Sequence, residues 1–96
     1  FTDQSFDIVL VANYLYRPRL AQLFALVRPG GCLVYETFAS GHAAFGRPRN
    51  PDYLLQEGEL AARLPPDFGI LDYFHGRVET PKPTMIQHML ARRHPA

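Results

Sequence analysis

The first forty positions of the chain carry two different apolar patterns. Residues 8–12 form a short apolar run rich in β-branched side chains, which predicts a strand buried on both faces. Between positions 19 and 27 the apolar residues follow the i, i+3, i+4, i+7 spacing of a helix with one buried face. Proline and two glycines at 29–31 end that helix, and residues 32–35 form a second apolar run. The pattern predicts two parallel strands joined by a right-handed helical crossover.

The remainder of the chain predicts further elements of an α/β fold. After the second strand, residues 36–41 begin a long loop that runs to residue 51 and contains too many glycines and prolines for a regular element. Acidic side chains before Leu60 begin a short helix, which the two prolines at 65–66 end. Residues 68–77 predict a strand, whereas periodicity alone allows a strand or a helix at 84–92; the short connection favours an antiparallel pair. We therefore expect an α/β fold with a mixed sheet, in which parallel strands are followed by an antiparallel C-terminal pair.

Composition narrows the class of protein. Ninety-six residues, 47% of them hydrophobic, make one small globular domain at most. The formal charge is +1, and the basic residues are scattered along the chain, so we expect no nucleic-acid partner. The single cysteine excludes an internal disulfide, provides no zinc cluster and favours a reducing, cytoplasmic location. No apolar run approaches the ~20 residues that span a bilayer, so we expect no membrane partner.

Three stretches together resemble one known family. Residues 6–38, FDIVLVANYLYRPRLAQLFALVRPGGCLVYETF, resemble the region between the fourth and fifth strands of class I S-adenosylmethionine-dependent methyltransferases. The features are F-D opening a strand, an apolar helix and R-P-G-G before the next strand. Residues 50–64, NPDYLLQEGELAARL, are similar to a later segment of a tellurite-resistance-type bacterial subgroup. Residues 85–93, MIQHMLARR, resemble the family's last strand, which lies antiparallel between the fifth and sixth.

The resemblance implies a partial Rossmann-like methyltransferase sheet and a methyltransferase that uses S-adenosyl-L-methionine to modify a small molecule. The family's glycine-rich loop and ribose-binding acid belong to an N-terminal half that has no counterpart here, and the chain begins at Phe1 instead of methionine. We therefore interpret residues 1–96 as the C-terminal portion of a longer enzyme, and expect the fragment alone to bind the cofactor weakly or not at all. The alternative is a non-catalytic interaction or scaffold module derived from the same fold.

Four residues follow the first predicted strand, where open α/β sheets place their ligands. They are Asn13, Tyr14, Leu15 and Tyr16. By resemblance, this segment lines the methionine end of the cofactor. The alternative is that the two tyrosines only pack against the missing half. No catalytic residue is assigned, because direct methyl transfer requires mainly positioning of its two reactants.

Substrate contacts are expected at the end of the neighbouring strand. Glu36, Thr37 and Phe38 end that strand on the same edge of the sheet, and an unpaired glutamate favours either a role or an exposed position. His42, in the long loop, serves either as a substrate-binding general base or as a solvated surface residue.

The other polar candidates have structural interpretations. Asp7 is expected to be a turn or capping residue, Cys32 a small core residue, and the histidines His75 and His88 structural members of the strand pair. A metal site has no support from the spacing of these residues. Without the missing half, the strand at 8–12 becomes an open apolar edge, which predicts a homodimer that covers this edge.

Overall fold

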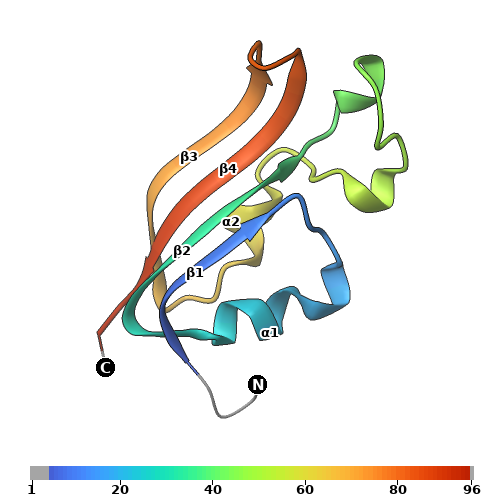
Figure 1. Cartoon of the computed structure of the whole chain (residues 1–96). Coiled ribbons are helices and arrows are strands. Elements are labelled where there is room, and N and C mark those ends of the chain that lie inside the picture. The colour runs from blue at the N-terminus through green and yellow to red at the C-terminus, as the bar shows by residue number, and fades with distance from the viewer. Residues whose placement is uncertain (1–4, 96) are drawn as a thin grey trace.

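Four strands form one mixed sheet in the computed structural model, which describes residues 5–95 (Figure 1). The strands are β1 (Phe6–Ala12), β2 (Val27–Phe38), β3 (Phe68–Val78) and β4 (Thr84–Arg93), in the order β1-β2-β4-β3. β1 and β2 are parallel, whereas β4 runs antiparallel to both β2 and β3. The predicted α/β fold with a mixed sheet is therefore confirmed, as is the antiparallel pair at the C-terminal end of the chain.

Short helices connect the strands. A 3₁₀ turn η1 (Arg17–Arg19) leads into α1 (Leu20–Ala25), and α2 (Glu59–Arg63) precedes β3. The long loop contains two further 3₁₀ turns, η2 (His42–Ala44) and η3 (Pro51–Tyr53), and a bridge between Ala39 and Leu55. Within residues 5–95, no helix has the length and apolar character that crossing a membrane requires.

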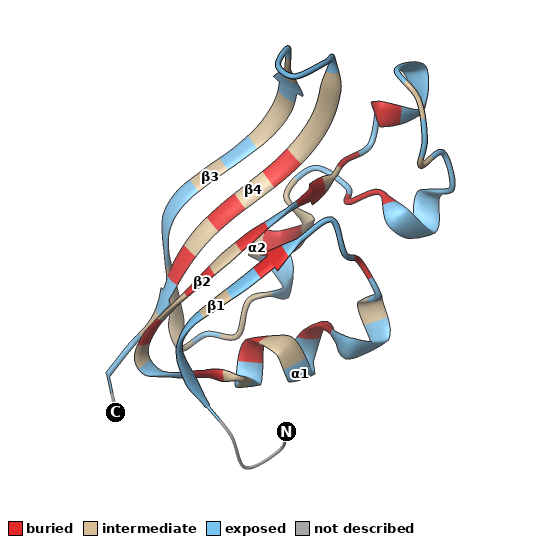
Figure 2. Ribbon diagram, viewed as in Figure 1, coloured by how far each residue is buried: buried red, intermediate tan, exposed pale blue. Residues whose placement is uncertain are grey.

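The core lies on one face of the sheet only (Figure 2). Helix α1 contributes Leu20 and Phe24, and α2 contributes Leu60, which are at most 2% exposed. These residues pack against alternate side chains of the sheet, including the buried Leu33 and Met89. The periodicity of the sequence correctly assigned the buried side of α1, because residues three and four apart share one helix face.

The opposite face of the sheet has no covering layer within the described residues. The strand at 8–12 was expected to be buried on both faces, but Ile8 is 68% and Leu10 71% exposed. Cys32 pairs with Ile8 on this open face and is partly exposed, so its predicted core position is also wrong. Both interpretations failed for the same reason: α1 and α2 belong to a single core cluster and cover the same side.

The R-P-G-G segment lies inside β2 instead of before it. β2 begins at Val27, and its pairing with β1 then jumps from Phe6↔Val27 to Ile8↔Cys32, so the intervening residues bulge out. Gly31 is required there, because an added Cβ would lie 2.7 Å from the Asp7 carbonyl oxygen. Asp7 itself belongs to β1 and pairs with Arg28 at 2.7 Å, which corrects its expected role in a turn or cap.

Candidate functional site

The candidate site is the edge where β1 and β2 end side by side. Ala12 pairs with Glu36, and the next backbone N–H, that of Asn13, donates to the Glu36 carbonyl oxygen at 3.0 Å. Asn13 then leaves the strand with φ 55°, in the left-handed region that asparagine tolerates better than most residues. The chain therefore turns sharply away from the sheet and presents the following residues along this edge.

The Asn13–Tyr16 segment alternates between solvent and core. Tyr14 and Tyr16 are 42% and 52% exposed, whereas Leu15 is buried in the core cluster. The Tyr35 hydroxyl donates a 2.6 Å hydrogen bond to the Tyr14 carbonyl oxygen. Burial raises the pKa of Tyr35, so this hydroxyl keeps its proton and remains a donor. The two exposed tyrosine rings are consequently held at the edge by a buried anchor beneath them.

The three residues that end β2 do not point in one direction. Glu36 is exposed and Phe38 partly exposed, and their register places both on the open face of the sheet. Thr37, between them, is 2% exposed and points to the covered side. Alternation along a strand requires this division, so only Glu36 and Phe38 present their side chains on the open face beside the edge.

His42 is buried at 3% exposure, so its interpretation as a solvated loop residue is wrong. Its Nδ1 accepts a 3.2 Å hydrogen bond from the Met85 N–H, which leaves the proton on Nε2. Nε2 then donates to the Arg47 carbonyl oxygen at 3.0 Å. The ring also packs against Phe38, with centroids 4.6 Å apart. Both nitrogens are thus engaged: Nδ1 fastens the loop to β4, and Nε2 holds the backbone of the loop itself.

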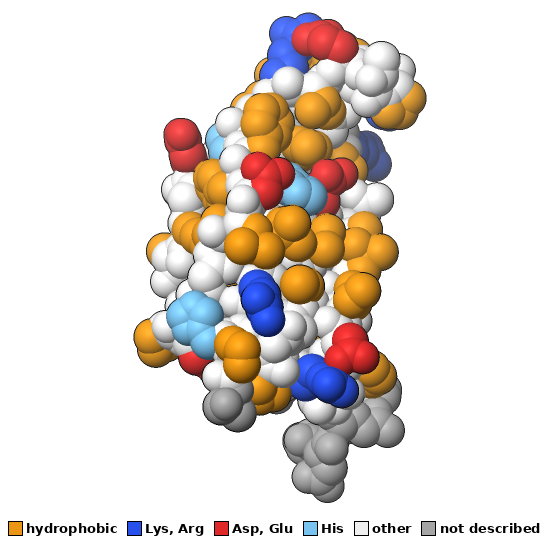
Figure 3. All heavy atoms as spheres, turned by 90° about the vertical axis from the view of Figure 1, so that its left-hand side faces the viewer, with side chains coloured by type: hydrophobic (Ala, Val, Ile, Leu, Met, Phe, Trp, Pro, Cys, Tyr) orange, Lys and Arg blue, Asp and Glu red, His pale blue; other side chains and the backbone are white. Residues whose placement is uncertain are grey.

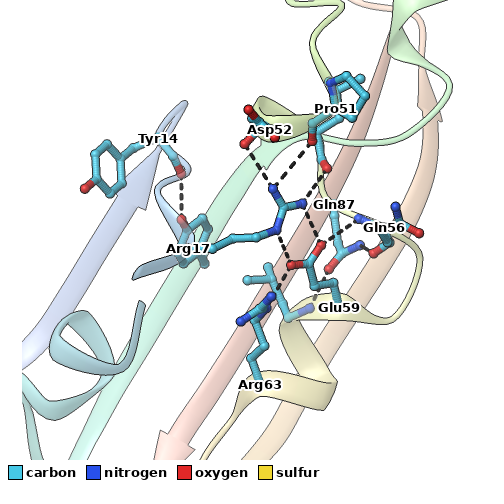
Figure 4. A network of polar contacts seen from close by, with 11 residues as sticks. Tyr14, Arg17, Pro51, Asp52, Gln56, Glu59, Arg63 and Gln87 are labelled. Atoms are coloured by element: carbon cyan, nitrogen blue, oxygen red, sulfur yellow. Dashed lines mark hydrogen bonds and ion pairs between the residues drawn. The ribbon is translucent and has the colours of Figure 1, made fainter. Parts of the chain in front are cut away.

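A partly buried arginine network joins the site to the long loop (Figure 4). The Arg17 guanidinium binds both carboxylate oxygens of Glu59, at 2.6 and 2.9 Å. It also donates to the carbonyl oxygens of Asp52 and Leu54, at 3.0 and 2.8 Å, and more distantly to that of Pro51 at 3.5 Å. One side chain that follows the tyrosine pair therefore holds η3 and the start of α2 in place.

The electrostatics of this network follow from its donors. The Arg17 hydrogen bonds, followed by a backbone bond from Gln56 and one from Arg63, lower the pKa of Glu59 to about 2 against the opposing effect of burial. The pKa of Arg17 rises, chiefly through its hydrogen bond to Glu59. Both groups are fully ionised at neutral pH, so the pair is a fixed part of the structure instead of a titrating one.

Gln87 makes a second polar junction, which joins β4 to the start of α2 and to β3. It lies in β4 with no exposed surface, and its Oε1 accepts from the Leu60 N–H at 2.9 Å. Its Nε2 donates to the Gln56 carbonyl oxygen at 2.7 Å and to His75 Nδ1 at 2.9 Å. The amide thereby satisfies an otherwise unpaired N–H in the first turn of α2, and His75 has the structural role that was expected of it.

Sequence reasoning missed both junctions. Arg17 and Glu59 are 42 residues apart, and Gln87 and Gln56 are 31 apart. Neither pair has a spacing that a helix or hairpin would bring together, so no local pattern could have revealed them. The other strand-pair histidine, His88, lies between two acids, and no group of three or more His, Cys, Asp or Glu residues within positions 5–95 is arranged to hold a metal.

The parallel β1–β2 pair, followed by β4 inserted antiparallel between β2 and β3, defines a methyltransferase-type α/β fold. Solved structures with this fold superpose on nearly the whole chain. A SAM-dependent methyltransferase from Methanosarcina mazei matches 100% of it with a TM-score of 0.66 and 17% identity. The [4+2]-cyclase SpnF matches 100% with a TM-score of 0.69 and 13% identity. A third structure comes from work on the conversion of a disulfide bond into a thioacetal group during echinomycin biosynthesis. It matches 97% of the chain with a TM-score of 0.65 and 11% identity.

These likenesses establish the fold alone. The chain spans 51–63% of the length of the three structures, so the activities of those whole proteins extend beyond what is shared. No family model and no curated protein sequence matches the chain. The tellurite-resistance-type subgroup therefore stays a prediction, whereas the resemblance to the methyltransferase fold is supported.

Proposed function

We propose that this chain is the C-terminal part of a cytoplasmic S-adenosylmethionine-dependent methyltransferase that acts on a small molecule. The proposal rests on the strand order β1-β2-β4-β3, in which β4 runs antiparallel to both its neighbours. The similarity to a SAM-dependent methyltransferase over the entire chain supports the same class. Because one fold serves many reactions, and SpnF is a cyclase, the site residues have to carry the remainder of the argument.

The residues at the edge suit one end of the cofactor. S-adenosylmethionine supplies the methyl group from a sulfonium cation that lies close to an ammonium and a carboxylate. Exposed aromatic faces such as Tyr14 and Tyr16 attract cations, and the exposed Asn13 amide can donate to a carboxylate. Leu15 takes a supporting role instead, because it is buried beneath them. These four residues match only part of the molecule, and we assign its ribose and adenine to an N-terminal segment.

The acceptor molecule would bind beside the end of β2. The exposed Glu36 carboxylate provides a hydrogen-bond acceptor, and the partly exposed Phe38 ring provides an apolar surface. Thr37 and His42 would support this region without contacting the acceptor directly, because both side chains are buried. His42 has both ring nitrogens engaged, so we propose that it positions the loop instead of removing a proton from the acceptor.

Titration calorimetry on the longer protein that contains this chain tests the proposal. We expect S-adenosylmethionine to bind the longer protein and to bind the 96-residue chain far more weakly. Tyr14→Ala and Tyr16→Ala should each weaken binding, whereas Phe74→Ala, an exposed aromatic on β3 at the far side of the sheet, should not. Absence of binding at millimolar cofactor would reject the proposed function.

The open apolar face favours a second candidate, a non-catalytic interaction or scaffold module. Ile8 and Leu10 are more than two-thirds exposed, and such surfaces are typical of binding sites for other polypeptides. This candidate predicts stable assembly without any affinity for S-adenosylmethionine. The calorimetric titration therefore separates the two candidates, whatever the state of assembly.

A further inference from the structure

One guanidinium group joins the two halves of the proposed site. Residues 13–16, which contact the cofactor in the proposed function and are called the cofactor segment below, end directly before Arg17. The Arg17 side chain reaches the far end of the long loop, where it donates to the Leu54 carbonyl oxygen at 2.8 Å. The N–H of the next residue, Leu55, donates to the carbonyl oxygen of Phe38 at 3.1 Å. A short series of bonded groups therefore connects the cofactor segment with the end of β2, beside which the acceptor is proposed to bind.

The contacts of Arg17 require an arginine. The guanidinium makes five hydrogen bonds, as many as it has N–H groups. Two go to the Glu59 carboxylate, and three go to the backbone carbonyl oxygens of Pro51, Asp52 and Leu54. A lysine has the same charge but a single nitrogen, so it cannot serve the carboxylate and all three carbonyl groups at once. Arg17 thus holds two separate parts of the chain in one fixed geometry.

This network lies on the covered side of the sheet. Exposed apolar side chains gather on the opposite face (Figure 3), whereas Leu60, the neighbour of Glu59, belongs to the core cluster between the helices and the sheet. The five partners of Arg17 all come from the described residues. The link between the cofactor segment and the loop is therefore complete without any partner on the open face.

We propose that Arg17 is a positioning residue that couples the cofactor segment to the long loop at residues 39–55. The coupling rests on the proposed function. When the loop leaves its place, Arg17 loses its partners, and the cofactor segment beside it is held less firmly. A cofactor that contacts Tyr14 and Tyr16 binds better to the firmly held form, so its binding favours the loop position in which Arg17 is bonded. The coupling is reciprocal, so a loosened loop weakens cofactor binding by the same factor.

The coupling determines when the acceptor site is complete. Phe38 continues into Ala39, which forms a bridge with Leu55 at the root of the loop. The Ser40 N–H donates to the Leu55 carbonyl oxygen at 2.8 Å and closes the same root. Cofactor binding would therefore fix the surface that the acceptor meets. Because methyl transfer requires chiefly that its two reactants are aligned, the expected order is cofactor first and acceptor second.

Amide hydrogen exchange of the longer protein, with and without S-adenosylmethionine, provides the first test. In the wild type we expect the cofactor to slow exchange at residues 39–55 at least about fivefold, the lower end for coupled sites. Arg17→Met keeps most of the side-chain length but no donor, so it should bind the cofactor more weakly and lose this response. A purely structural role would speed exchange equally with and without cofactor and leave the response unchanged. Arg19→Met is the matched control, because Arg19 is exposed on the same turn and its described contact is a 3.5 Å bond to Gln22.

A double-substitution cycle in the same protein without cofactor tests the link directly. The backbone amides of Asn13 and Arg19 lie on either side of the tyrosine pair, and each donates a hydrogen bond of 3.0 Å. Glu59→Gln should speed exchange of both at least about fivefold relative to the amides of β4, which report on global unfolding. In the Arg17→Met background the same substitution should add nothing, because the connection to the loop is already broken.

The two measurements separate this proposal from the proposed function. Absence of S-adenosylmethionine binding rejects the function, and the cycle then decides alone whether Arg17 links the two segments. Additive effects in the cycle would overturn the proposal, as would cofactor binding that leaves exchange of the wild-type loop unchanged or a loop response that persists in Arg17→Met. Arg17→Lys replaces Arg17→Met if circular dichroism shows the latter to be unfolded. Lysine keeps the charge beside Glu59 but loses the carbonyl contacts, so the same outcomes are expected.

Discussion

Replacing Glu59 by glutamine tests the network that fastens the long loop to the candidate site. The Glu59 side chain is 10% exposed, and its two oxygens accept hydrogen bonds from Arg17, Arg63 and the Gln56 N–H. Glutamine keeps the size of the side chain but offers a single acceptor oxygen, and its NH₂ group would face the Arg17 donors. The substitution therefore removes a charge and at least one favourable contact without creating a cavity.

The expected loss of stability follows from the pKa of Glu59. A carboxyl whose pKa falls from 4.5 to about 2 on folding has a ceiling of ~3 kcal/mol for the stabilisation of its ionised form. The Arg17 and Arg63 side chains are 26% and 42% exposed, so water screens part of the interaction. We therefore expect Glu59→Gln to lower the free energy of unfolding by about 2 kcal/mol near neutral pH.

The same pKa determines how the effect depends on pH. Above pH 4.5 the group is ionised in both the folded and the unfolded chain, so its full contribution is present. As the pH falls from 4.5 to about 2, the unfolded chain takes up the proton first and the contribution disappears. The wild type should therefore lose its advantage over Glu59→Gln across this window, and the two proteins should converge in stability near its acid end.

Urea denaturation of both proteins at several pH values measures this difference. Glu57→Gln is the control, because Glu57 is exposed and forms no ion pair within the described residues. It should change stability by a few tenths of a kcal/mol at most. A difference between wild type and Glu59→Gln that is below about 0.5 kcal/mol, or that stays constant down to about pH 2, would refute the assignment.

Three further substitutions examine other parts of the fold by equilibrium unfolding. Gln87→Leu should cost about 1–3 kcal/mol, because the buried Leu60 N–H and the partly buried Gln56 carbonyl lose their partners, while Gln22→Leu on the exposed side of α1 should cost little. Gly31→Ala should cost about 1–3 kcal/mol, because its Cβ would lie 2.7 Å from a β1 carbonyl oxygen; Gly69→Ala, which meets only a histidine side chain at 3.3 Å, should be much milder. Tyr35→Phe should lower the free energy of unfolding by about 1 kcal/mol and speed amide hydrogen exchange in residues 13–16, because the Tyr14 carbonyl loses its hydrogen bond. Unchanged exchange in these residues would show that the Tyr35 hydroxyl does not hold the segment.

Local patterns were reliable wherever a single element decided the outcome. The i, i+3, i+4, i+7 spacing around Phe24 identified the buried side of α1, and the apolar runs identified β1 and β2. The R-P-G-G segment was misplaced, because Gly30 and Gly31 read as a stop signal before a strand. Pairing with β1 at Phe6↔Val27 instead draws these glycines into β2 as a bulge.

The candidate site was predictable only in outline. The position of Asn13 and Tyr14 follows from the end of a parallel strand, because ligand sites gather there in open α/β sheets. Which neighbours face outward does not follow from that rule, and Thr37 and His42 proved to be buried. The Arg17–Glu59 pair gave no local signal, since its members meet only after the loop folds back.

The sequence by itself determined the order of the main elements and the type of most of them, because the strand and helix periods depend on neighbouring residues. For β4, periodicity left strand and helix open, and only the short connection to β3 favoured a strand. The sequence also carried the resemblance to the methyltransferase fold, which the strand order β1-β2-β4-β3 and the structural neighbours support. Only the tertiary structure decided which face of the sheet is covered, because burial depends on where both helices pack and not on any strand's own composition. For the same reason it alone revealed the bare apolar face and the polar junctions that hold the loop, each built from residues far apart in the chain.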